Sequence, residues 1–140
     1  MDHMRTFAIS QAGLQVERMR VEVAALNLAN ANTVLKPGQP GYQPLKVSAL
    51  SQSQQFAAMI DGGLALPEAS IVTQGTAPRA VHDPKHPAAD AQGMVYYPAV
   101  DSAEQMIELM GAVRSYEANI AAINAARSMA LKALEIGGGA

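Results

Sequence analysis

Two histidines and two aspartates cluster in one short segment of the sequence: His82, Asp83, His86 and Asp90. Imidazole and carboxylate groups are common ligands of zinc and other divalent cations, so this composition could serve a metal site. A proline follows Asp83 and another follows His86, and proline restricts the neighbouring backbone to rigid turns. These turns hinder convergence of the four side chains. We therefore predict solvent-exposed turns without a metal ion; a small metal-binding hydrolase or adaptor centred on His82 and His86 is the alternative.

Glu104 and Glu108 would lie one helical turn apart, and paired carboxylates can act as general acid and base in hydrolysis. The sequence suggests no second catalytic group beside them, and it contains no glycine-rich phosphate loop, no G-x-S-x-G and no H-E-x-x-H motif. We predict that the protein is not an enzyme and has no catalytic residue, cofactor or small-molecule substrate. The two glutamates are then charges on a solvated helix face.

The composition excludes several other classes of protein. The 140 residues include 10 Lys and Arg against 12 Asp and Glu, and basic runs interleaved with aromatic residues are absent. This balance argues against a nucleic-acid-binding protein. The sequence has no cysteine, which excludes disulfides and thiolate metal sites. Because there is no long apolar run and no apolar core of a signal peptide near the start, we expect neither membrane insertion nor a cleaved signal peptide.

The N-terminal segment from residue 5 to residue 30 predicts a long helix with two apolar faces. It contains no proline, and one set of apolar residues recurs at alternating spacings of three and four, as in a heptad repeat. A second set, spaced by seven, falls nearly opposite, so one partner helix cannot cover both. The first set includes Ile9, Val16, Met19, Val23 and Leu26, and the second is Phe7, Leu14, Val21 and Leu28.

The C-terminal segment from residue 101 to residue 136 predicts a second long helix with the same heptad pattern. Asp101 or Ser102 can cap its start, and the glycines from Gly137 onward end it. Small residues on the flank of its apolar stripe would let a neighbouring backbone approach closely. The stripe includes Met106, Leu109, Val113, Tyr116, Ile120, Ile123 and Leu134.

Between these helices, proline and glycine recur and predict loops with short strands at 45–50, 70–73, 80–82 and 94–97. A helical turn is a candidate at 52–60. The predicted fold class is mainly α: two long terminal helices form an elongated coiled-coil hairpin, with a small irregular β-containing middle segment. Residues 1–36 hold the first helix and an asparagine-rich turn, 37–100 the middle segment, and 101–140 the second helix.

Helices of about 54 and 40 Å exceed the size of a compact domain of this length, whose radius of gyration would be about 14 Å. The predicted shape is therefore elongated rather than globular. The middle segment is too short to cover two helices with two apolar faces each. We predict that other copies or other chains bury much of the apolar surface, so the chain is an assembly subunit.

Three asparagines lie within six residues at the end of the first predicted helix: Asn27, Asn30 and Asn32. Asparagine is poor inside a helix but tolerates turn and left-handed conformations, so these residues would let the helix end and the chain reverse. Asn30 also falls on the apolar stripe, where a polar residue can fix the register of two helices.

Three motifs follow one another along the sequence: N-L-A-N-A-N-T, then D-P-x-H-P with a downstream P-x-V-D, and finally R-S-Y-x-x-N. The first motif is carried by Asn27, Leu28, Ala29, Asn30, Asn32 and Thr33. The second is carried by Asp83, Pro84, His86, Pro87, Asp90, Gly93, Pro98, Val100 and Asp101. The third is carried by Arg114, Ser115, Tyr116 and Asn119. Together they resemble the motifs of the bacterial flagellar rod and hook protein family, and among its members those of the proximal rod proteins.

The resemblance implies a non-enzymatic structural subunit of the flagellar basal-body rod, the shaft that crosses the periplasm and transmits torque. It implies that the partners are other rod proteins and copies of the same chain, joined through the apolar stripes of the terminal helices. It also implies export by the flagellar type III apparatus without a cleaved signal. The alternative within this class is another proximal or inner-rod subunit of a type III export apparatus.

Overall fold

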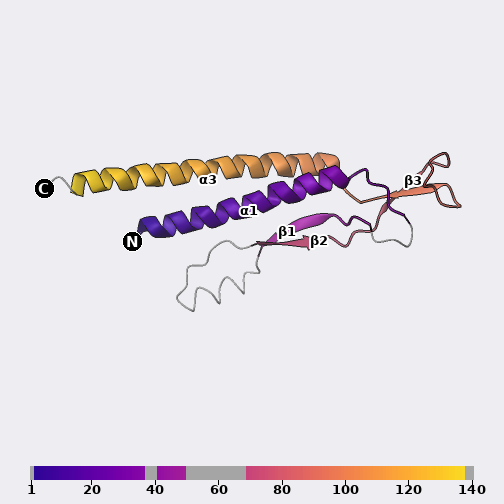
Figure 1. The fold of residues 1–140 in the computed structure, drawn as a ribbon, viewed down its shortest axis with the longest axis horizontal. Helices are drawn as coiled ribbons and strands as arrows, with labels where there is room; N and C mark the ends of the chain where they lie inside the picture. The colour runs from indigo at the N-terminus through magenta and orange to yellow at the C-terminus, as the bar shows by residue number, and fades with distance from the viewer. Residues whose placement is uncertain (1, 37–40, 50–68, 138–140) are drawn as a thin grey trace, which may run out of the picture.

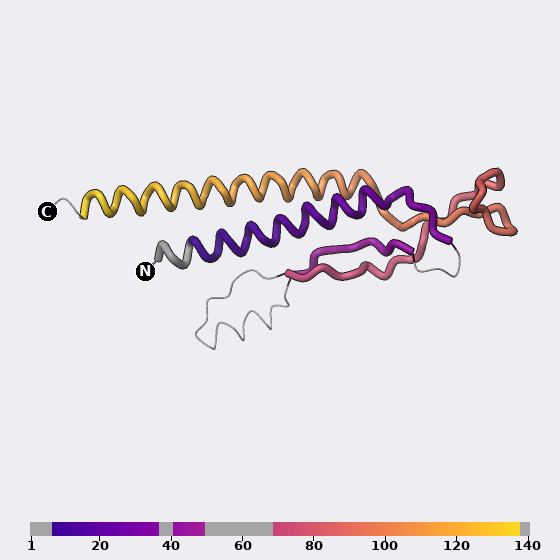
Figure 2. The backbone as a smooth tube through the Cα atoms, viewed as in Figure 1, coloured from indigo at the N-terminus to yellow at the C-terminus, as the bar shows by residue number. Residues whose placement is uncertain are grey.

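The computed structural model describes residues 2–36, 41–49 and 69–137, with side chains from Phe7 onward in the first helix. Its elements are α1 (Asp2–Asn30), β1 (Leu45–Ala49), β2 (Ala69–Thr73), β3 (Arg79–His82), β4 (Met94–Tyr97) and α3 (Ser102–Gly137). The two helices lie side by side and run in opposite directions along the molecule (Figures 1 and 2). The prediction of a mainly helical fold with two long terminal helices is confirmed.

The start of α3 is fixed by Asp101, one of its two candidate caps. The carboxylate Oδ1 of Asp101 accepts hydrogen bonds from the backbone N–H groups of Ala103 and Glu104, at 2.9 and 3.2 Å. These bonds satisfy amides that have no partner in the first turn of a helix. At its other end, α3 stops at Gly137, as the glycine run predicts.

The end of α1 is a turn, which is one of the two conformations expected of its asparagines. In the described part of the chain, no residue other than glycine has a positive φ, so the asparagines do not adopt the left-handed conformation. Instead, Asn30 donates from Nδ2 to the Leu26 carbonyl at 2.9 Å, and its own carbonyl accepts the Thr33 amide at 3.0 Å. The chain therefore leaves the helix through an ordinary tight turn closed by the asparagine side chain and backbone.

Four strands form two separate antiparallel hairpins, β1–β2 and β3–β4. All four lie close to the predicted segments; residue 50 and the helical turn proposed at 52–60 fall outside the described residues. Figure 1 shows the order α3, α1, β1, β2 across the molecule, with β2 outermost. An isolated bridge between Leu35 and Tyr96 ties the segment after α1 to β4.

The β1–β2 hairpin lies against the part of α1 whose apolar stripe was predicted to meet a partner helix. Val16 and Val23 of α1 and Leu45 and Val47 of β1 line one crevice between the helix and the hairpin. One apolar face of α1 is therefore partly covered within the chain, by the hairpin rather than by a second helix.

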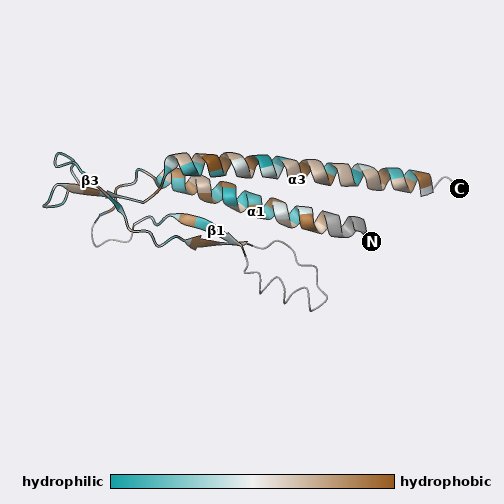
Figure 3. Ribbon diagram, turned by 180° about the vertical axis from the view of Figure 1, so that it is seen from behind, coloured by the Kyte–Doolittle hydropathy of each residue, from teal (hydrophilic) through white to brown (hydrophobic). Residues whose placement is uncertain are grey.

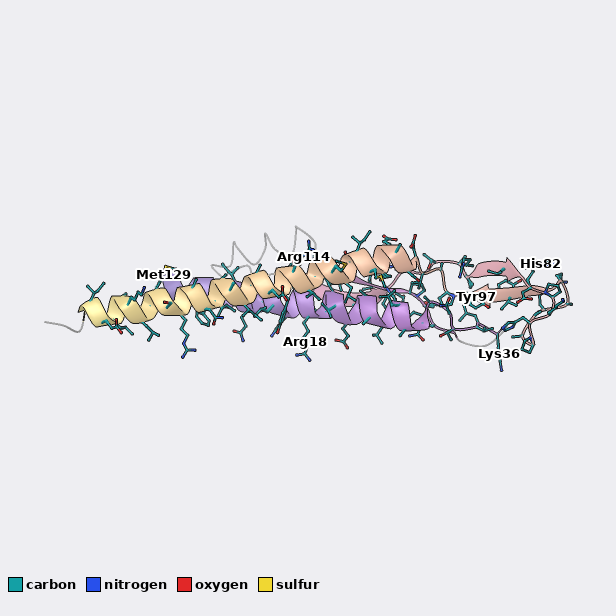
Figure 4. All side chains as sticks on the ribbon, turned by 90° about the horizontal axis from the view of Figure 1, so that it is seen from above. Arg18, Lys36, His82, Tyr97, Arg114 and Met129 are labelled. Carbon is teal, nitrogen blue, oxygen red and sulfur yellow. The ribbon has the colours of Figure 1, made fainter. Side chains whose placement is uncertain are left out.

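The β3–β4 hairpin forms the end of the molecule opposite the chain termini. In Figure 4, His82 and Tyr97 lie at this end and Met129 lies near the other, so the molecule is elongated. Val95 and Pro98 are fully buried and form the small core of this end. The rest of the core lies along α1 and α3.

Candidate assembly interface and its polar junction

Asn27 connects α1, β1 and α3 through a set of hydrogen bonds that uses its whole amide group. Nδ2 donates to the Leu45 carbonyl at 2.9 Å and to Gln105 Oε1 at 2.8 Å. Oδ1 accepts the Tyr42 hydroxyl at 2.7 Å and the Leu45 amide at 2.9 Å. The residue is completely buried. An asparagine amide has two donors and two acceptor positions, so no hydrogen-bonding capacity is left over.

Arg20, two helical turns before Asn27, joins the two helices by an ion pair. Its guanidinium bonds Glu108 of α3, with Nε and Nη2 each 2.7 Å from Oε1, and Glu17 of α1, with Nη1 3.1 Å from Oε2. The hydrogen bond with Glu108 is the main cause that raises the pKa of Arg20 above its usual value. Glu108 is thus an ion-pair partner between helices, and it is not poised beside Glu104 as a catalytic acid.

This junction was not predicted from the sequence. Asn30 was expected to fix the register, whereas Asn27 makes the contacts with α3 and β1. A usable signal was present: Asn27 follows Ala24 by three positions and precedes Ala31 by four, so it shares a helix face with two small, buried residues. A polar residue in the middle of such a face must find partners inside the fold.

The face of α3 that lies against α1 carries small and polar residues. The contacts that define this face are those of Gln105 with Asn27, Glu108 with Arg20, and Asn119 with the backbone near Gly13. Residues that recur on it at spacings of three and four are buried or half-buried, and we call them the α3 seam. The α3 seam is Gln105, Glu108, Ala112, Tyr116, Asn119, Ile123 and Ala126.

Gly13 lies where α1 and α3 approach closely, and its replacement by leucine should destabilise the subunit. A Cβ atom at Gly13 would lie 3.2 Å from Asn119 Nδ2. We expect Gly13→Leu to lower the free energy of unfolding by about 1–3 kcal/mol, the usual cost of overpacking. The measurement is urea unfolding of the subunit. The control is Gly111→Leu on α3, where nothing lies within 4 Å, and an equal loss there would contradict the packing argument.

The predicted apolar stripes divide into a part that packs within the subunit and a part that stays exposed. Val23 is buried. The half-buried members are Leu14, Val16, Met19, Val21, Leu28, Leu109, Tyr116 and Ile123. The exposed members are Phe7, Ile9, Leu26, Met106, Val113, Ile120 and Leu134. The stripe on α3 therefore overlaps the α3 seam only in part. Tyr116 and Ile123 belong to both, but the buried positions of the seam are Ala112 and Ala126 rather than larger apolar residues.

Exposed apolar residues continue along α3 beyond the predicted stripe. Ile107 is 73% exposed and Ile136 is 84% exposed. The hydropathy colours of Figure 3 show hydrophobic residues along the whole length of α3, including the end that extends past α1. We call the exposed apolar residues of α3 its outer face. They are Met106, Ile107, Met110, Val113, Ile120, Met129, Leu131, Leu134 and Ile136.

The motif residues at the turn end of the helices are mostly structural. Pro98 is buried, Val100 is half-buried, and Asp101 is the helix cap described above. Ala29, Asn32, Thr33 and Arg114 are exposed, whereas Ser115 and Asn119 are half-buried on α3. In Figure 4, Arg18 and Arg114 extend outward from opposite sides of the helix pair.

The histidine and aspartate cluster forms the loop that joins β3 to β4, and its side chains bind the loop's own backbone. Asp83 Oδ1 accepts the Lys85 amide at 3.3 Å, and His86 Nδ1 accepts the Ala88 amide at 3.1 Å. Gly93 has a φ of 75°, and a Cβ atom there would lie 3.1 Å from both His82 and Pro84. In the described ranges, no three His, Asp or Glu residues are gathered as metal ligands. The geometry supports rigid turns.

Asp90 is the centre of this loop. Its Oδ1 accepts the amides of Gln92 and Met94 at 2.9 and 2.8 Å, and its Oδ2 accepts the Tyr96 hydroxyl at 3.0 Å. These bonds, first of all the one from the Met94 amide, hold the pKa of Asp90 below its usual 3.8. The same contact with Asp90 raises the pKa of the Tyr96 hydroxyl.

The loop should therefore lose stability only in strong acid. Because the pKa of Asp90 is lower in the folded protein than in the unfolded chain, its contribution is present above pH 3.8 and is lost as the pH falls through the depressed pKa. We expect the Gln92 and Met94 amide signals in an NMR titration to shift below pH 3.8. The Asp90→Asn variant serves as the control without this transition. A transition at or above pH 3.8 in the unmodified chain would contradict the bonding described here.

Comparison with known proteins finds relatives over almost the whole chain. The family model "Flagellar basal body rod FlgEFG protein C-terminal" matches residues 91–136, which include most of α3. The chain is 38% identical to the flagellar basal-body rod protein FlgC of Salmonella typhimurium, over 96% of this chain and 97% of the relative. It is 33% identical to FlgC of Bacillus subtilis, over 92% and 94% respectively. Neither α1 nor α3 is long and apolar enough to cross a membrane in the part described.

Proposed function

The chain belongs to the FlgC family of flagellar basal-body rod proteins, and from this membership we propose that it builds the proximal rod by packing its terminal helices against neighbouring subunits. Its role is that of a structural, non-enzymatic rod subunit. In the proposal, its neighbours are copies of itself and other rod proteins. The assembled rod crosses the periplasm and transmits torque.

The observation that carries the proposal is the outer face of α3. Met106, Ile107 and Met110 are each more than half exposed at one end of the helix, and Leu131, Leu134 and Ile136 are more than half exposed at the other. Soluble monomers rarely leave an apolar surface of this extent uncovered. Burial of such surface at about 25 cal/mol per Å² is the main favourable term in subunit association. The outer face therefore supports packing against other subunits along the whole helix.

We also propose that α1 and α3 form a two-stranded antiparallel coiled coil. The spacings of three and four along the α3 seam support this geometry. So do the contacts Asn27–Gln105, Arg20–Glu108 and Gly13–Asn119, whose residue numbers run in opposite directions. In this arrangement residues 1–36 and 101–140 form the axial part, and residues 37–100 lie along it or bridge to neighbours. Export by the flagellar type III apparatus without a cleaved signal is part of the same proposal.

Electron cryomicroscopy of isolated basal bodies tests the proposal directly. We expect density for both helices in the axial core of the proximal rod, with the outer face of α3 covered by neighbouring subunits. If the chain were absent from the rod, or if its helices faced solvent there with the middle segment inside, the proposed packing would be wrong. Motility of a strain that lacks the gene, restored by the intact chain, provides the matched functional control.

A further inference from the structure

The β1–β2 hairpin has one closed edge and one open edge. In antiparallel strands, alternate residues direct their backbone groups toward the partner strand. The Gln74 amide donates to the Pro44 carbonyl at 2.8 Å, which sets this alternation. The backbone N–H and C=O of Leu45 therefore point away from β2, and both are hydrogen-bonded to the side chain of Asn27 of α1. On β2, the outward residue at the centre is Ile71, opposite Val47 in the register.

The β3–β4 hairpin repeats this arrangement. The Asp83 amide donates to the Gly93 carbonyl at 2.9 Å, which sets the alternation of this hairpin. The backbone N–H and C=O of Tyr96 on β4 and of Ala80 on β3 therefore point away from the partner strand. The Tyr96 carbonyl accepts the Leu35 amide at 2.8 Å, which closes the β4 edge. On β3, all four residues of the strand are exposed. Among the described residues, the outward backbone groups of β2 and β3 form no hydrogen bond.

The open edge of β2 lacks the features that usually prevent strand pairing, whereas β3 begins at Arg79, directly after Pro78. Edge strands are commonly protected by lysine, proline, a bulge or a covering element. β2 has the sequence ASIVT, with no charge and no proline, and Ile71 at its centre is 42% exposed. Val81 of β3 is 36% exposed. A two-stranded hairpin is only marginally stable in water, and neither α1 nor α3 packs on β3–β4, so each hairpin would gain from a further strand.

We propose that the open edge of β2 in one subunit pairs with the open edge of β3 in a second copy of the chain, which gives a four-stranded sheet across the subunit boundary. The inference rests on the proposed rod function and adds a strand-pairing contact to the packing of the helices. The two strands have similar lengths, five residues in β2 and four in β3. Backbone hydrogen bonds supply the attachment, as in other cases of strand addition between chains.

A second copy fits the two edges better through unlike pairing than through like pairing. If β2 paired with β2, the contact would be two-fold symmetric, would close after two subunits and would leave both β3 edges open. Pairing of β2 with β3 joins two different surfaces of the same chain, so it can be repeated from subunit to subunit. A rod subunit requires contacts of this open kind.

Cross-linking in assembled rods tests the inference, because the chain has no cysteine of its own. Cells would express two versions of the chain, one with Ile71→Cys and one with Ala80→Cys, and isolated basal bodies would be treated with a short thiol-specific cross-linker. We expect a cross-linked dimer when both versions are present. Each version expressed alone should give none.

The possible results separate the inference from the proposed function. A dimer from Ile71→Cys alone would mean that β2 pairs with β2, and the proposed occupant would be wrong. Cysteine chains that enter the rod but give no dimer in any combination would overturn the strand pairing and leave the rod function intact. Chains missing from the rod even without substitution would contradict the function itself.

A backbone variant provides an independent check. Ile71→Pro removes an outward N–H that has no partner among the described residues, so the hairpin should remain, while incorporation into rods should fall at least about tenfold. Val72→Pro removes an N–H directed at β1 and should disrupt the hairpin itself, which circular dichroism and proteolysis would detect. Normal incorporation of Ile71→Pro would overturn the proposal.

Discussion

Replacement of Asn27 by leucine is expected to lower the free energy of unfolding of the subunit by about 3–5 kcal/mol. Leucine fills a similar space but offers no hydrogen bond, so the Tyr42 hydroxyl, the Leu45 amide and the Gln105 amide lose their common partner. Buried polar groups without partners cost about 1–3 kcal/mol each. The higher helix propensity of leucine offsets only a few tenths of a kcal/mol. Urea unfolding followed by circular dichroism measures the change.

The matched control is Asn32→Leu, which makes the same substitution at an exposed position of the same motif. It should change the free energy of unfolding by no more than about 0.5 kcal/mol. In the Asn27→Leu variant, amide exchange at Leu45 should also accelerate, because its N–H no longer has an acceptor. Equal stability of the two variants, or unchanged exchange at Leu45, would show that the polar junction does not hold the three elements together.

Replacement of Ile107 by aspartate is expected to abolish rod assembly while the subunit itself remains folded. Ile107 is 73% exposed in the subunit, so a charge there should alter the free energy of unfolding by no more than about 0.5 kcal/mol. In the rod, the same position would be covered by a neighbour, and an unpaired buried carboxylate costs about 3–5 kcal/mol. A loss of this size lowers association at each site by at least about 100-fold. Motility assays and quantification of the chain in isolated basal bodies measure the effect.

Ser128→Asp is the control for this prediction. It adds the same charge to an exposed position of α3 that is not part of the outer face and whose neighbours four residues away on either side, Asn124 and Lys132, are polar. We expect nearly normal motility from this variant. If Ile107→Asp assembled as well as Ser128→Asp, the outer face of α3 would not be a subunit interface; if Ile107→Asp failed to fold in isolation, Met110→Asp would repeat the test at a second exposed site.

The helices and strands could be predicted from the sequence because each is marked by local features. Heptad spacing, a capping residue at Asp101 and terminal glycines define α3, and proline and glycine bound the four strands. These features act over a few residues, so they can be recognised without knowing which other element packs against the helix or strand. The predicted fold class was therefore correct in its helices and hairpins, while the coiled-coil geometry stays a proposal.

The relative placement of the elements could not be predicted in the same way. Periodicity alone favoured Met106 and Val113 for the helix contact, yet α3 meets α1 through Ala112 and Asn119, because close approach at Gly13 favours small side chains. The junction at Asn27 depends on residues far apart in the sequence, Tyr42 and Gln105 among them. Such contacts depend on the packed structure, and the spacing of residues along the sequence indicates them only indirectly. The assembly residues themselves stay predictions, since they concern other chains.

The position of the polar contacts along the helix pair has a mechanical consequence. Between residues 7–30 and 102–137, every hydrogen bond and ion pair that joins α1 to α3 lies near the turn, at Asn27 and Arg20. Toward the chain termini no hydrogen bond or ion pair joins the described parts of the two helices, and packing contacts constrain direction less than hydrogen bonds do. We therefore expect the pair to be stiffer near the turn than at its termini, so a bending load should change the angle between the helix ends first. In the proposed rod, one sequence could in this way occupy quasi-equivalent positions, where the first and last copies in an array have different neighbours from the copies between them.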